Sequence, residues 1–134
     1  MKQWTVTDVA ERFEEAVYTL KRLPPVRVQG FISTWPEVIH TTLELLQADK
    51  RPLRLGSPSA EAITRMEETI QWVFYLDTED ERRLVWSKAN RVPNRQICAF
   101  LGCGRTKLWQ MWSVALLKIT MRLNAKEKGR HHGR

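Results

Sequence analysis

The side chains best suited to chemistry with a partner gather in one short run near the C-terminal end of the sequence. An arginine can form two hydrogen bonds with guanine, a glutamine can do the same with adenine, and Thr, Lys and Ser can contact base edges or phosphates. A tryptophan can stack on bases or sugars, or equally pack against another helix. The run contains Arg105, Thr106, Lys107, Trp109, Gln110 and Ser113. These residue types at this spacing predict contacts with double-stranded DNA.

The distribution of charge favours the same interpretation. Residues 1–81 hold 9 Lys and Arg against 14 Asp and Glu, whereas residues 82–134 hold 13 against a single acid, Glu127. The net charge of +7 therefore comes entirely from the last part of the chain. This asymmetry indicates a polyanionic partner, with nucleic acid expected first and a solvated basic face as the alternative. Three further cations are expected to bind phosphates beside the run: Lys88, Arg91 and Arg95.

Other kinds of site fit the sequence poorly. Cys98 and Cys103 could suggest a metal site together with His131 and His132, but the cysteine spacing and the adjacent histidines match no ordinary zinc finger. The cysteines are therefore expected to be small buried residues. The carboxylates cluster on helix faces and at caps, and no nucleophile–base set or glycine-rich phosphate loop is present. The sequence predicts no enzyme activity, no metal and no cofactor.

Two helices joined by a tight turn are expected to position the run. Pro93 suits the first turn of a short helix at residues 94–101, in which Ile97 and Leu101 share one face. Gly102 follows at once, and glycine accepts the positive φ that such a turn needs. A short helix, a glycine turn and a second helix together predict a helix-turn-helix, whose second helix presents its first turns to the major groove.

The second helix of this pair is expected to begin near Gly104 or Arg105 and to run to about Asn124. Its first turns carry an apolar face that can pack on the preceding helix, formed by Leu108, Met111 and Trp112. Residues 114–123 are apolar on most sides, which is typical of a helix buried on two faces. The second face can pack on the N-terminal helices or on a partner subunit, and both alternatives stay open.

Helices are also predicted in the first part of the chain. Thr5 with Asp8 forms an approximate capping box for a first helix, which Pro24 and Pro25 end. Residues 23–32 are expected to be an extended connector, and a second helix follows Thr34 or Trp35 with Pro36 in its first turn. The apolar face of the first helix consists of Val9, Phe13, Ala16, Val17 and Leu20.

Two more helices are predicted before the helix-turn-helix. Ser57 and Pro58 have the order of a cap and a first-turn proline, and Thr78 with Glu81 forms a capping box. The first of these helices has an apolar stripe of Ile63, Met66, Ile70, Val73 and Phe74. In the second, Leu84, Val85 and Ala89 are expected to face inward.

The sequence thus predicts an all-α fold of about six helices, with an N-terminal helical subdomain and a C-terminal helix-turn-helix that has a long last helix. Residues 1–76 form an acidic module for protein contact or dimerisation, residues 77–124 the DNA-binding module, and residues 125–134 a basic disordered tail. No apolar run approaches the length of a membrane span, and no secretory leader is apparent. A cytoplasmic protein is expected, associated with the bacterial nucleoid when it binds DNA.

Three segments carry a resemblance to the promoter-binding, C-terminal helix-turn-helix of bacterial sigma factors, and to small phage regulators with that fold. They are DERRLVW at residues 80–86, ICAFLG at residues 97–102 and RTKLW at residues 105–109. Cys98 stands where that pattern usually has Ala, and Gly104 where it usually has Ser, which weakens the expected N-cap of the second helix. The resemblance implies promoter binding, with RNA polymerase as a protein partner.

Nearly the whole chain, from Trp4 to Asn124, also resembles an uncharacterised family of short proteins from alphaproteobacterial phages and prophages. The likeness is carried by RLPPVRVQG at residues 22–30, WP at 35–36, RLVW at 83–86 and RLN at 122–124. It implies a phage or prophage origin and no particular activity.

Taken together, these observations predict a DNA-binding transcriptional regulator of phage or prophage origin, with a homodimer as an open alternative to a monomer. One rival hypothesis keeps the helix-turn-helix in a small DNA-packaging subunit of the terminase type that assembles in rings. Another is a protein–protein inhibitor or adaptor that uses the fold only as a scaffold.

Overall fold

The computed structural model describes residues 3–23, 36–39 and 56–132, with side chains described up to residue 126. The secondary structure in these ranges is helical, and the predicted all-α class is confirmed. The elements are α1 (Val6–Arg22), α4 (Ala60–Trp72), the 3-10 turn η2 (Val73–Tyr75), α5 (Glu79–Ala89), α6 (Asn94–Leu101) and α7 (Arg105–His132). The predicted connector at residues 23–32 lies outside the described residues except for Leu23, which has an extended backbone. The predicted second helix also lies outside them, except for Pro36 and the helical residues 37–39.

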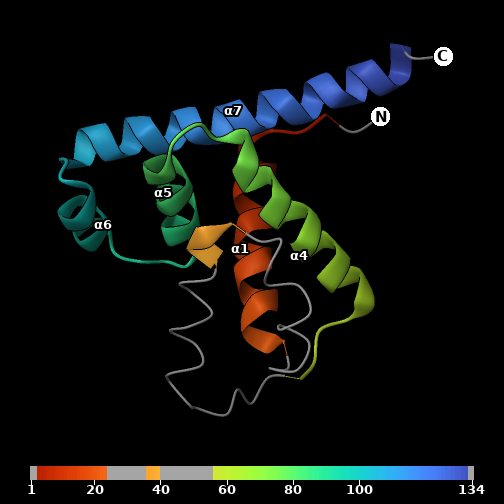
Figure 1. Cartoon of the computed structure of the whole chain (residues 1–134), viewed down its shortest axis with the longest axis horizontal. Coiled ribbons are helices and arrows are strands. Elements are labelled where there is room, and N and C mark those ends of the chain that lie inside the picture. The colour runs from red at the N-terminus through yellow and green to blue at the C-terminus, as the bar shows by residue number, and fades with distance from the viewer. Residues whose placement is uncertain (1–2, 24–35, 40–55, 133–134) are drawn as a thin grey trace.

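The long helix α7 organises the molecule. It lies across one end of α5, α1 and α4, and α6 lies beneath its first turns (Figure 1). α1 packs most extensively against α4, and also contacts α5 and α7. At 1.5 Å per residue, α7 is about 42 Å long. One helix therefore joins the helical packing of the first part of the chain to the predicted helix-turn-helix.

The helix starts show which local signals the chain uses. In the predicted box before α1, the Asp8 amide donates to Thr5 Oγ1 and the Thr5 amide to Asp8 Oδ2, both at 3.1 Å. The box of Thr78 and Glu81 before α5 is also present. The start predicted at Ser57 and Pro58 is wrong: α4 begins at Ala60, because the Ser59 hydroxyl accepts the Ala62 amide at 3.1 Å.

The end of α7 also differs from the prediction. The sequence predicts a helix to about Asn124 followed by a disordered tail, whereas α7 continues to His132. Residues 125–128 are Ala, Lys, Glu and Lys, which are strong helix formers, and no proline follows Pro93. Ala125 and Lys126 are exposed, so the helix continues here without packing against the core.

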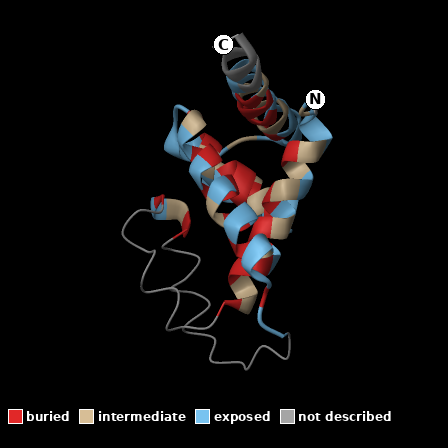
Figure 2. Ribbon diagram, turned by 90° about the vertical axis from the view of Figure 1, so that its right-hand side faces the viewer, coloured by how far each residue is buried: buried red, intermediate tan, exposed pale blue. Residues whose placement is uncertain are grey.

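The main core is shared by four helices. The fully buried residues Phe13 of α1, Ile70 of α4, Trp86 of α5 and Ile119 of α7 belong to one cluster. Buried residues lie on the facing sides of the helices (Figure 2). This core includes residues from both predicted modules, 1–76 and 77–124.

One predicted core residue faces solvent. Phe74 was expected on the apolar stripe of α4, but its side chain is 47% exposed. The reason is the 3-10 turn η2, which interrupts the helical register after Trp72 and keeps Val73 buried while it turns Phe74 outward. The Arg82 guanidinium lies 5.7 Å from the Phe74 ring.

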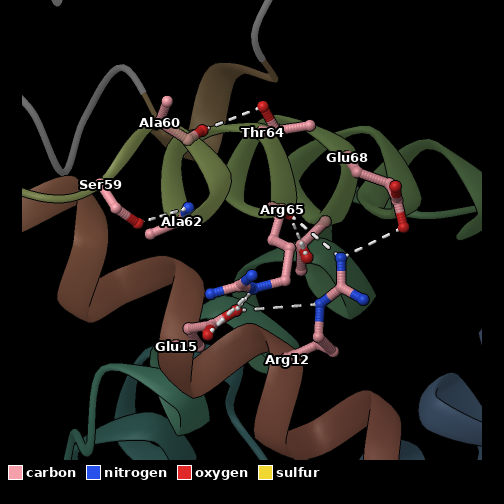
Figure 3. A network of polar contacts seen from close by, with 9 residues as sticks. Arg12, Glu15, Ser59, Ala60, Ala62, Thr64, Arg65 and Glu68 are labelled. Carbon is pink, nitrogen blue, oxygen red and sulfur yellow. Dashed lines mark hydrogen bonds and ion pairs between the residues drawn. The ribbon is translucent and has the colours of Figure 1, made fainter.

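A polar network joins α1 to α4 at the surface of this core (Figure 3). Arg12 Nη2 donates to Glu68 Oε1 at 3.1 Å and to the Arg65 carbonyl at 3.3 Å, and Arg65 Nε donates to Glu15 Oε1 at 3.0 Å. The Arg12 guanidinium also lies 4.9 Å from the Trp72 ring centre. The guanidinium groups of Arg12 and Arg65 thus form their contacts within the fold.

Candidate nucleic-acid interface

A second, smaller core holds the predicted helix-turn-helix together. It consists of one fully or almost fully buried residue from each of three helices: Leu84 of α5, Ile97 of α6 and Leu108 of α7. Met111 and Trp112 pack against it, as the sequence predicts. Because each helix contributes to this core, α5 and α7 together fix the position of α6.

The turn between α6 and α7 has the expected backbone. Gly102 adopts φ 69° and ψ 39°, in the left-handed region, and its amide donates to the Cys98 carbonyl at 2.8 Å. The Cys103 amide donates to the same carbonyl at 3.1 Å. α7 then begins at Arg105, and the Leu108 amide donates to the Gly104 carbonyl at 3.0 Å. The predicted bounds of α6, residues 94–101, are confirmed.

We expect a Gly102→Ala variant to lose about 1–2 kcal/mol of unfolding free energy, because alanine is strained in the left-handed region. The space at this position is open, so the cost is one of backbone conformation alone. Gly104→Ala is the matched control, since Gly104 lacks a positive φ and is equally open. Urea denaturation should show that variant to be unchanged or slightly more stable. Equal losses in both variants would contradict this account of the turn.

The first turns of α7 present most of the predicted contact residues to solvent. Four of the six are exposed polar or charged side chains: Arg105, Thr106, Lys107 and Gln110. Trp109 is 66% exposed, so the alternative that it packs against another helix of this chain is not what the structure shows. Ser113 is half-buried. No acidic residue occurs in the first turn of α7, and its free backbone N–H groups add partial positive charge there.

The cations expected to bind phosphates differ in their surroundings. Arg95 is exposed in the first turn of α6. Lys88 donates to Asn94 Oδ1 at 3.0 Å and lies 4.6 Å from the Trp112 ring centre, so it joins α5, α6 and α7. Arg91, at a positive φ of 60°, forms an ion pair with Glu14 of α1 at 3.4 Å. Of the three, Arg95 is the best placed to contact an external anion.

The start of α6 exposes two polar side chains that the sequence does not single out. Asn94 and Gln96 are exposed at the start of α6, the helix that crosses the DNA backbone in a helix-turn-helix. Both side chains are uncharged, so the charge distribution of the sequence does not point to them. Their position follows from the residue at which α6 begins.

A three-residue ion-pair group fixes the start of α5 to the middle of α7. Lys118 Nζ donates to Glu81 Oε2 at 2.8 Å and to Asp77 Oδ2 at 3.2 Å, and Glu81 is only 8% exposed. Burial by itself would raise the pKa of Glu81, but hydrogen bonds from Lys118 and Thr78 lower it below its ordinary value of 4.5. This group therefore holds the middle of α7 against the start of α5 at neutral pH.

A carboxylate with a lowered pKa stabilises the fold above its unfolded pKa, and that contribution is lost as the pH falls through the folded value. We therefore expect Lys118→Met to be less stable than the wild type near neutral pH, with a difference that shrinks below about pH 4.5. Thermal unfolding of both proteins across a pH series measures this. A difference that stays constant down to about pH 3 would contradict the assignment.

Two other properties of the described residues bear on the site. Among them, no group of three or more His, Cys, Asp and Glu side chains could hold a metal ion. None of the helices in the described ranges has both the length and the apolar character that crossing a membrane requires.

Comparison with known proteins gives one match. A family model described as a domain of unknown function (DUF6362) matches residues 21–119, which include α4, α5, α6 and the first half of α7. No curated protein and no solved structure matches the chain.

Proposed function

We propose that this chain, which belongs to the family of the domain of unknown function (DUF6362), binds double-stranded DNA through α6 and the first turns of α7. The observation that carries the proposal is the exposed N-terminal end of α7, where Arg105, Lys107 and Gln110 project beyond a small buried core. These side chains follow a turn that backbone hydrogen bonds close, and they are exposed to solvent. In this proposal residues 77–124 bind DNA, and residues 1–76 contact another protein.

The chemistry of the exposed side chains suits the major groove. Arg105 can form two hydrogen bonds with guanine and Gln110 two with adenine. Trp109 can contact a thymine methyl group or a sugar with its exposed ring. Arg95 and the free backbone N–H groups at the start of α6 can bind phosphates and so set the register of the protein on the duplex.

The biological role that we propose is transcriptional regulation in a phage or prophage. This step depends on the resemblance of residues 80–109 to the promoter-binding domain of sigma factors. In that role the first turns of α7 contact promoter or operator DNA, and another surface contacts RNA polymerase. Transcription from a template that carries a selected site, with and without the protein, tests the role separately from binding.

The experiment that tests DNA binding uses the purified full chain and a fluorescent duplex of random sequence at two salt concentrations, followed by selection of preferred sites. We expect binding at low salt that weakens as salt rises, and a recovered consensus sequence. The absence of binding at low salt would overturn the proposal. Binding with a steep salt dependence and no consensus sequence would support the DNA-binding interface but contradict sequence-specific regulation.

A second candidate function, a DNA-packaging subunit that assembles in rings, is favoured by a specific surface. Val114, Leu117 and Met121 are 48%, 47% and 63% exposed and follow one face of α7, where they can contact a second copy of the chain. Sedimentation equilibrium distinguishes the two functions. A regulator predicts a monomer or dimer, and a packaging subunit predicts a higher-order assembly that serine at these three positions disrupts.

A further inference from the structure

The two cysteines of the chain lie on opposite sides of the turn between α6 and α7. Cys98 is in the last turn of α6, and Cys103 is the first residue after Gly102. Both are free and half-buried, and both pack against the small core of Leu84, Ile97 and Leu108. From the sequence, both are expected to be small buried residues without a functional role.

The backbone of the turn brings the two cysteines together. The Cys103 amide donates to the Cys98 carbonyl at 3.1 Å, and the Gly102 amide donates to the same carbonyl. This pattern ends many helices, and a hydrophobic contact between these same two positions often accompanies it. Here the two positions are occupied by thiols, and both side chains pack against the same small core. Two cysteines whose backbones are joined by a hydrogen bond, and whose side chains pack against one core, need little backbone movement to meet the short range of a disulfide.

We propose that Cys98 and Cys103 form a reversible thiol-oxidation site, in which an intrachain disulfide closes across the turn by exchange with a low-molecular-weight disulfide. In the first step the thiolate of one cysteine attacks the small disulfide, forms a mixed disulfide and releases one small thiol. The other cysteine then attacks the mixed disulfide and releases the second small thiol. The two cysteine sulfurs are oxidised, the two sulfurs of the small disulfide are reduced, and the cysteine protons end on the released thiols.

The surroundings set the rate of this exchange. Burial raises the pKa of Cys103, and the contact with Cys98 raises it further. A smaller thiolate fraction at neutral pH slows attack, so closure should become faster as the pH rises. The inference does not depend on DNA binding, because it needs only the geometry of the turn.

The test uses the full-length protein in buffers with graded ratios of oxidised to reduced glutathione. After acid quenching and alkylation, cleavage after Arg95 and Arg105 releases one peptide, residues 96–105, that contains both cysteines. Its disulfide form is recognised by the loss of two hydrogen masses without alkylation. The same titration in denaturant gives the effective concentration of the two thiols in the unfolded chain.

We expect the folded protein to close at an oxidised-to-reduced ratio about tenfold lower than the denatured protein does. The oxidised protein should then melt at a higher temperature than the reduced one, and a reductant should reverse the difference. Cys98→Ser and Cys103→Ser should each retain glutathione as a mixed disulfide, because no second thiol can displace it. Closure no more favourable than in the denatured chain, or an oxidised protein that melts at the same or a lower temperature, would overturn the proposal.

Discussion

Alanine at both Arg105 and Lys107 is expected to weaken binding to a selected duplex by roughly 30- to 1,000-fold without destabilising the protein. Both side chains are exposed in the first turn of α7, and no described ion pair holds either of them within the fold. One lost base contact and one lost phosphate contact account for this range. Fluorescence anisotropy at fixed salt measures the affinity, and urea denaturation measures the stability.

The matched control removes the same charge from the same helix at a distance. Arg122 and Lys126 lie about 25 Å farther along α7, where their cationic groups are 5.7 and 5.0 Å from the Tyr75 ring centre. The Arg122→Ala, Lys126→Ala variant should bind DNA almost as the wild type does. Equal losses in both double variants would mean that the protein attracts DNA by net charge alone. No loss in either would favour the hypothesis that the fold is only a scaffold for protein contacts.

The second large effect is expected from Ile97→Ala, which should cost about 2–5 kcal/mol of unfolding free energy. Ile97 is fully buried between Leu84 and Leu108, and α6 buries no other residue as completely. Without this contact α6 has little to hold it at its angle to α7, so DNA binding should fall with stability. Urea denaturation and anisotropy on the same preparations measure the two losses.

Ile97→Val is the graded control and should cost about 0.5–1.5 kcal/mol. The main core of α1, α4, α5 and α7 does not include Ile97. Far-UV circular dichroism of the alanine variant should therefore retain most of its helical signal. A variant that loses all helical structure at once would show that the two cores fold as a single unit.

The helices α6 and α7 and the turn between them could be predicted from the sequence because their signals are local. Pro93 marks the start of α6, and Gly102 supplies the left-handed residue at its end. Leu108, Met111 and Trp112 recur at helical spacing on the packed face of α7. Each signal depends on residues a few positions apart, where backbone conformation and side-chain periodicity decide the structure.

The contacts that the sequence did not reveal connect residues far apart in the chain. Asn124 accepts the Trp4 amide at 2.8 Å and donates to the Trp4 carbonyl at 3.0 Å, across 120 positions. Similarly, the ion pair of Arg91 with Glu14 on α1 joins residues 77 positions apart, and the sequence does not reveal it. The sequence shows that a charged side chain is present, but only the fold shows which group of opposite charge lies near it.

The exposure of Phe74 and the start of α4 show a different limit. A 3-10 turn differs from an α-helix by a small change in rise and twist, which an apolar pattern of five residues cannot detect. The choice between Ser57 and Ser59 as cap depends on one hydrogen bond. Element types were predictable, but the register at their ends was not.

The most direct test of the central claim is an amide-resolved NMR titration of the full chain with a short duplex at low salt. We predict chemical-shift changes concentrated at residues 94–96 and 105–110, with small changes in α1 and α4. The changes at residues 105–110 should disappear in the Arg105→Ala, Lys107→Ala variant. Changes centred on α1 or α4 instead, or no changes at low salt, would contradict the assignment of the first turns of α7 as the DNA-binding surface.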